Sequence, residues 1–91
     1  MIKEIVTWSL FCRVGQQYEF QDEPADSVEQ AKAIASQKMK EFADRTGLQR
    51  LTATVLLTVG DMHEDGFHGR VVERLWEKLG IDEEWEEEQD D

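Results

Sequence analysis

The N-terminal part of the chain alternates between apolar and polar side chains, a pattern typical of strands with one buried face. From residue 2 to residue 14, one parity carries Ile2, Val6, Trp8, Leu10, Cys12 and Val14. The other parity is polar except for Ile5 and Phe11. The alternation resumes over residues 17–21, with Tyr18 and Phe20 on one side, and Gly15 between the two segments suits a tight turn. The pattern predicts a β-hairpin that turns near Gly15.

A helix is predicted between Ser27 and Gly47. Ser27 with Gln30, or Asp26 with Glu29, has the spacing of a capping box. Gly47 can take the left-handed conformation that follows many helices. Between these two ends, apolar side chains recur at helical intervals, namely Val28, Ala31, Ile34, Ala35, Met39 and Phe42.

Residues 51–59 show the clearest strand pattern in the chain. Their apolar face would hold Leu51, Ala53, Val55, Leu57 and Val59, and their polar face Thr52, Thr54 and Thr58. Such a regular strand suits a central place in the sheet, and we expect it there.

Residues 67–79 predict a second helix, because their apolar side chains fall at helical intervals. These side chains are Phe67, Val71, Val72, Leu75, Trp76 and Leu79. Gly80 followed by apolar Ile81 fits a Schellman end of that helix. We therefore expect one α+β domain over residues 1–81, in the order β-β-α-β-α, with a three-stranded antiparallel or mixed sheet covered by helices.

The charge of the chain is concentrated at its C-terminal end. The 91 residues carry a formal net charge of -11. Residues 82–91 contain eight carboxylates and no basic group, so they carry -8 and leave about -3 for residues 1–81. We expect residues 82–91 to be an acidic C-terminal tail.

This charge limits the kinds of partner that the chain can bind. Surfaces that bind nucleic acid or anionic membranes need Lys and Arg, so the sequence predicts neither as a direct ligand. A basic protein surface fits the acidic tail better. The single cysteine, Cys12, cannot form an internal disulfide, and no targeting or membrane-spanning pattern is visible, so we expect a cytoplasmic protein.

The acidic tail is the strongest candidate for a binding segment. The partner-binding residues predicted from the sequence are Asp82, Glu83, Glu84, Trp85, Glu86, Glu87, Glu88, Asp90 and Asp91. Trp85 would be an interface anchor among the carboxylates, because aromatic side chains often anchor interfaces. The alternative is that Trp85 folds back onto the last helix while the acids keep the protein soluble.

A second cluster of polar residues lies between residues 61 and 68, and comprises Asp61, His63, Glu64, Asp65 and His68. The spacing of His63 and His68 matches no recognised zinc motif, and the run lacks the alternating ligands of a calcium loop. A small metal-dependent enzyme using both histidines is the weakest of the functions weighed. We expect a loop in which Asp65 or His68 caps the second helix, with no metal and no cofactor.

The sequence does not predict an enzyme. Cys12 is expected on the buried face of a strand, where a thiol is inert. Ser9 and Ser27 have no histidine and acid at a recognisable spacing that would activate them.

In size, acidity and the combination of a small α+β body with a dense acidic terminus, the chain resembles the heterogeneous group of phage-encoded inhibitors and DNA mimics. That group includes anti-CRISPR and anti-restriction proteins. The resemblance implies a non-enzymatic inhibitor that blocks a basic, nucleic-acid-binding surface of a partner protein. The alternative is an assembly module that associates, as a homodimer or with another protein, through a sheet edge or the apolar face of the second helix.

Overall fold

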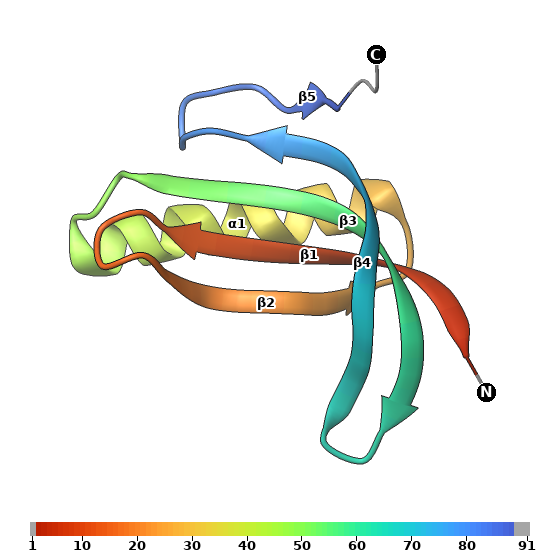
Figure 1. The fold of residues 1–91 in the computed structure, drawn as a ribbon. Coiled ribbons are helices and arrows are strands. Elements are labelled where there is room, and N and C mark those ends of the chain that lie inside the picture. Colours follow the sequence, from red (N-terminus) through yellow and green to blue (C-terminus); the bar gives the residue numbers. More distant parts are fainter. Residues whose placement is uncertain (1, 89–91) are drawn as a thin grey trace.

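The computed structural model describes residues 2–88, and these form one five-stranded sheet and one helix (Figure 1). The elements in chain order are β1 (Lys3–Cys12), β2 (Gln17–Ala25), α1 (Val28–Thr46), β3 (Leu51–His63), β4 (Gly66–Lys78) and β5 (Glu86–Glu87). All neighbouring strands are antiparallel, in the order β2-β1-β3-β4-β5. The central place predicted for residues 51–59 is confirmed, since β3 is the middle strand.

The first hairpin forms where the sequence predicts it. β1 and β2 pair antiparallel across a turn in which Gly15 has a φ of 84° and Gln16 a φ of 50°. Glycine adopts this left-handed conformation without the steric cost that a Cβ atom brings.

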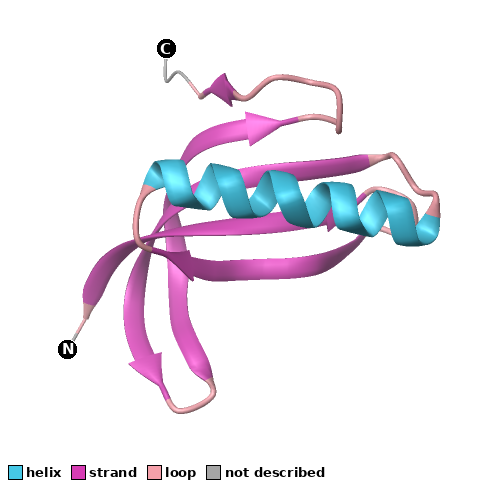
Figure 2. Cartoon of the chain, turned by 180° about the vertical axis from the view of Figure 1, so that it is seen from behind, coloured by secondary structure: helices cyan, strands magenta, loops and turns pink. Residues whose placement is uncertain are grey.

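Helix α1 also begins and ends as predicted. The Ser27 side chain accepts a hydrogen bond from the backbone N–H of Gln30 at 3.1 Å, which satisfies one of the free donors of the first turn. Gly47 ends the helix with a φ of 77° and donates its N–H to the carbonyl of Ala43. Figure 2 shows α1 lying along one face of the sheet.

The core lies between α1 and that face of the sheet. The buried residues of the helix are Ala31, Ala35, Met39 and Phe42. The strands oppose them with Trp8, Leu10, Cys12, Leu51, Ala53 and Val55. Cys12 is 1% exposed, so its predicted burial is confirmed. The small alanines let the helix approach the sheet closely.

The predicted second helix is wrong, because residues 66–78 form strand β4. Two irregularities in the pairing with β3 explain the misleading pattern: Val72 and Leu75 are extra residues that have no partner in β3. Each bulge adds one residue and reverses the alternation of the strand. The apolar residues 71, 72, 75 and 76 therefore fall at the intervals of a helical face, although the backbone is extended.

This finding also overturns the predicted fold class. The described residues form a five-stranded sheet with one helix, and not a three-stranded sheet in the order β-β-α-β-α. Gly80 does not end a helix. Asp65 and His68 do not cap one, since the β3–β4 turn contains Asp65 and β4 contains His68. An assembly surface on the second helix is excluded for the same reason.

A bulge in β2 changes which residues share a face. Leu10 pairs with Phe20 and Phe11 pairs with Tyr18, so Glu19 is an extra residue. The predicted common side of Tyr18 and Phe20 is therefore wrong. Phe20 packs against Trp8 in the core, with ring centroids 5.1 Å apart, and Tyr18 lies on the opposite face of the sheet.

The sheet is strongly curled. In Figure 1 β4 crosses in front of the other long strands, and it contacts β2 although two strands, β1 and β3, lie between them in the sheet. Gly60 and Gly69 face each other at the bend, where a Cβ atom on Gly60 would lie 2.1 Å from the carbonyl oxygen of His68. Only glycine permits such a close approach of two strands. No helix within residues 2–88 is long and apolar enough to cross a membrane.

Candidate functional site

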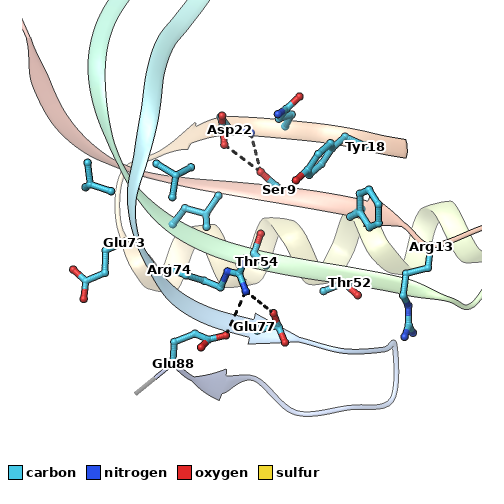
Figure 3. A pocket seen from close by; sticks show the side chains of 15 residues that line it. Ser9, Arg13, Tyr18, Asp22, Thr52, Thr54, Glu73, Arg74, Glu77 and Glu88 are labelled. Atoms are coloured by element: carbon cyan, nitrogen blue, oxygen red, sulfur yellow. Dashed lines mark hydrogen bonds and ion pairs between the residues drawn. The ribbon is translucent and has the colours of Figure 1, made fainter. Parts of the chain in front are cut away.

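The curl of the sheet creates a groove of about 660 Å³ on the face opposite α1 (Figure 3). We call it the open-face groove. The residues that line it come from β1, β2, β3 and β4, from the first turn and from the position after β5: Ser9, Phe11, Arg13, Tyr18, Gln21, Asp22, Thr52, Thr54, Leu56, Val71, Val72, Glu73, Arg74, Glu77 and Glu88.

Hydroxyl groups from β1 and β3 lie along the bottom of the groove. Ser9 of β1 pairs with Thr54 of β3, and Thr52 follows on the same face of β3. Ser9 accepts a hydrogen bond from the backbone N–H of Asp22 at 2.9 Å and donates to its carboxylate at 3.4 Å. Asp22 has a φ of 50°, in the left-handed region, at the second irregularity of β2. The bulge therefore turns this carboxylate toward Ser9.

Two aromatic rings form one wall of the groove. Phe11 and Tyr18 pair across β1 and β2, with ring centroids 5.0 Å apart in an edge-to-face arrangement. Tyr18 is 52% exposed. A half-exposed ring of this kind can stack on an apolar or cationic group of a ligand.

Charged side chains of β4 and the side chain of Glu88, which follows β5, form the opposite rim. Figure 3 shows the Arg74 guanidinium directed at Glu77 and Glu88, which it approaches to 3.5 Å and 3.9 Å. Glu73 stands apart from this cluster (Figure 3). At the other end of the groove, Arg13 donates a hydrogen bond to the backbone carbonyl of Leu79.

The part of the acidic tail that the structure describes is attached to the domain. β5 pairs with Trp76 and Glu77 of β4, and the N–H of Glu88 donates to the carbonyl of Leu75 at 3.0 Å. Lys78 bonds to the backbone carbonyl of Glu83. We call residues 82–88 the acidic segment. Its carboxylates are all exposed, and they belong to Asp82, Glu83, Glu84, Glu86, Glu87 and Glu88. Asp90 and Asp91 lie outside the described residues.

Trp85 differs from its acidic neighbours, because its indole faces the domain. The ring is half-buried against the core, and its N–H donates to the hydroxyl of Ser36 in α1 at 3.0 Å. Of the two alternatives that the sequence left open, the structure shows the folded-back position, although on α1 rather than on a second helix. The indole therefore holds the acidic segment against the domain.

The polar cluster predicted between residues 61 and 68 lies at the tip of the β3–β4 hairpin. The rings of His63 and His68 meet edge to face with centroids 4.8 Å apart, and His68 bonds to Asp65 at 2.7 Å. This hydrogen bond is the main cause that lowers the pKa of Asp65 below its ordinary value. Within residues 2–88, no three His, Cys, Asp or Glu side chains come together as a set of metal ligands.

The candidate nucleophiles lie apart from the histidines. Cys12 is buried on the α1 side of the sheet, where its thiol donates to the carbonyl of Val14. Ser9 lies in the groove beside Asp22, but neither His63 nor His68 lines the groove. The arrangement around Ser9 offers a hydroxyl and a carboxylate for binding, without the histidine of a serine triad.

The groove is not predicted from the sequence. Phe11, Tyr18, Arg74 and Glu77 were not predicted as site residues, because their common face depends on bulges in β2 and β4. Two features of the sequence indicate this face: the row of threonines on the polar face of β3, and the aromatic ring of Phe11 in a parity that is otherwise polar except for Ile5.

Comparison of the chain with protein-family models, with curated proteins and with solved structures finds no match. The groove and the acidic segment are therefore interpreted from their own chemistry.

Proposed function

We propose that the protein is a non-enzymatic inhibitor that occupies a basic, nucleic-acid-binding surface of another protein with its acidic segment. One observation carries the proposal: residues 82–88 are held on the sheet and on α1, while their six carboxylates remain exposed. A segment that is already ordered loses less conformational entropy on binding than a free tail does. Closely spaced carboxylates also attract basic surfaces and speed the encounter.

Trp85 and the carboxylates of the acidic segment have different roles in this function. The indole positions the segment through Ser36 and the core, and the carboxylates contact the partner. This function is the one implied by the chain's resemblance in composition to phage inhibitors and DNA mimics. The cytoplasm is the compartment that we propose, since Cys12 is an unpaired thiol.

The test is the capture of partners from the native cytosol with the full chain at low and high salt. The test variant carries Glu83→Gln, Glu84→Gln, Glu86→Gln and Glu87→Gln, which remove four exposed charges and leave Trp85 in place. The control variant removes the same charge elsewhere, with Glu4→Gln, Glu29→Gln, Glu41→Gln and Glu64→Gln, all at exposed positions.

We expect the unaltered chain and the control variant to retain the same nucleic-acid-binding protein at low salt, and added nucleic acid to displace it. The test variant should not retain this protein, because it lacks four of the charges that attract a basic surface. High salt should release the protein from the unaltered chain, because it screens the same attraction. Equal retention by the test variant would contradict the proposed function.

A second candidate function is assembly through a sheet edge. β5 pairs with Trp76 and Glu77, and no other described strand pairs with the outer edge of β4 from Gly66 to Leu75. The Leu75 carbonyl on this edge is bonded to the N–H of Glu88, so the open part runs from Gly66 to Arg74. An open edge can pair with a strand of a second copy or of another protein. Sedimentation of the purified chain distinguishes the two functions: an edge-paired homodimer that Val72→Pro dissociates supports assembly, and a monomer at all concentrations counts against self-assembly.

A further inference from the structure

The open-face groove combines three kinds of chemistry in one cavity of about 660 Å³. Its bottom carries the hydroxyls of Ser9 and Thr54, and its wall carries the half-exposed ring of Tyr18. Its rim carries charged side chains of β4 and the carboxylate of Glu88. Hydroxyl groups can donate to or accept from a peptide backbone, and an exposed ring can cover a side chain. A cavity of this composition suits a ligand with both polar and apolar parts.

The charges of the groove favour a cationic ligand. Its carboxylates belong to Asp22, Glu73, Glu77 and Glu88, and its guanidinium groups belong to Arg13 and Arg74. The groove therefore has four carboxylates and two guanidinium groups. Arg74 already lies beside two of the carboxylates, Glu77 and Glu88. Glu88 belongs to the groove and to the acidic segment, so the two negative surfaces are continuous.

The aromatic wall supports the same choice of ligand. Tyr18 and Phe11 pack edge to face, and Tyr18 lines the groove while about half of it is exposed, so part of its ring is accessible to a ligand. Lysine and arginine side chains can lay their alkyl stems along such a ring while their charges reach nearby carboxylates.

We propose that the open-face groove binds a short extended peptide with Lys or Arg at alternate positions, supplied by the basic partner. An extended chain directs every second side chain to the same side, so alternate cations would point at the carboxylate rim. The inference rests on the proposed function and adds the place where a segment of the basic partner binds.

The test uses two synthetic peptides, the blocked sequence Lys-Leu-Lys-Leu-Lys and its counterpart Glu-Leu-Glu-Leu-Glu. Each is titrated into the full chain labelled with ¹⁵N, and backbone amide shifts are followed by NMR. We expect the lysine peptide to produce saturable shifts at Ser9, Tyr18 and Thr54, and the glutamate peptide to produce none.

Variants then locate the binding site. Thr54→Arg fills the bottom of the groove and adds a positive charge, so it should abolish the shifts. Tyr18→Ala removes the exposed ring and should raise the Kd about tenfold, and it keeps the test decisive if Thr54→Arg fails to fold. Glu41→Gln is the control, because Glu41 lies on α1 on the other face of the sheet, and it should leave the Kd unchanged.

Four outcomes would overturn the inference: no saturable shifts with the lysine peptide, equal binding of both peptides, unchanged binding by Tyr18→Ala and Thr54→Arg, or shifts confined to residues 82–88. The last outcome leaves the proposed function intact, because the acidic segment alone then binds the cations. Conversely, groove binding of the lysine peptide together with unchanged cytosolic capture by the test variant removes the proposed function and keeps the groove.

Discussion

Trp85 donates its indole N–H to the hydroxyl of Ser36, a residue 49 positions earlier in the chain. This hydrogen bond joins the acidic segment to α1, while β5 joins the same segment to β4. Two independent attachments therefore hold a stretch of like charges that would repel one another as a free tail. The indole therefore contributes to the order of the acidic segment together with β5.

Replacing Trp85 by alanine should release the acidic segment from the domain. We expect a loss of about 2 kcal/mol in the free energy of unfolding, because the indole is half-buried rather than fully buried. Urea unfolding measures this loss. Hydrogen exchange at the Glu88 N–H, which is bonded to the Leu75 carbonyl, should become faster.

Ser36→Ala is the matched variant for this contact, because it removes the acceptor and leaves the ring. It should cost about 1 kcal/mol and leave Trp85 partly protected from solvent. An unchanged Glu88 exchange rate in Trp85→Ala would show that β5 alone holds the segment.

The close approach at the β3–β4 bend should tolerate no side chain. Gly60→Ala places a Cβ atom 2.1 Å from the backbone oxygen of His68 and 2.4 Å from the Cα atom of Gly69, and backbone atoms cannot move aside as a flexible side chain can. We expect a loss of about 3 kcal/mol in the free energy of unfolding, measured with urea.

The matched control for this bend is Gly80→Ala. Its Cβ atom would meet the flexible Glu83 side chain at 3.3 Å, so the change should stay within about 0.5 kcal/mol. Equal stability of Gly60→Ala and Gly80→Ala would mean that the two strands are farther apart at the bend.

Much of the fold could be predicted from local patterns, and the exceptions have a common cause. The turn at Gly15, the cap at Ser27 and the central strand depend on residues close in sequence, and each was predicted. Strand β4 was not predicted, because Val72 and Leu75 are extra residues that interrupt the alternation of apolar and polar side chains. The apolar residues of β4 then have the spacing of a helical face. Periodicity alone cannot separate a twice-bulged strand from an amphipathic helix.

The candidate site shows the same limit. The acidic segment is visible in composition, but its attachment depends on a contact between Trp85 and Ser36 that no local pattern contains. The groove depends on bulges that turn Tyr18 and Asp22 to one face, and on a curl that brings β4 over that face. These relationships are set by pairing register, which a single sequence does not reveal.

Thr7 of β1 and Thr58 of β3 form a buried hydrogen bond whose contribution to stability can be measured. Both residues are 0% exposed, and their hydroxyl oxygens lie 2.7 Å apart. Thr7→Val alone leaves the Thr58 hydroxyl buried without this partner, so we expect a loss of about 2 kcal/mol in the free energy of unfolding.

The double variant Thr7→Val with Thr58→Val completes the cycle. It removes both polar groups at nearly constant volume and should recover most of the lost stability. Additive losses from the two single variants would show that the hydroxyls are not bonded to each other.

The ion pair at the hairpin tip should be visible in the titration of Asp65. The hydrogen bond from His68 favours the charged carboxylate, so the pKa of Asp65 lies below its ordinary value of 3.8. A carboxyl whose pKa is lowered by folding stabilises the native state above its ordinary pKa, and this contribution is lost as the pH falls through the lowered value. Removing the imidazole with His68→Ala should therefore raise the pKa of Asp65 toward 3.8. Carboxyl NMR shifts measure it, and His63→Ala is the control that keeps the His68 contact. A pKa of Asp65 that is the same in the unaltered chain and in His68→Ala would contradict the pairing.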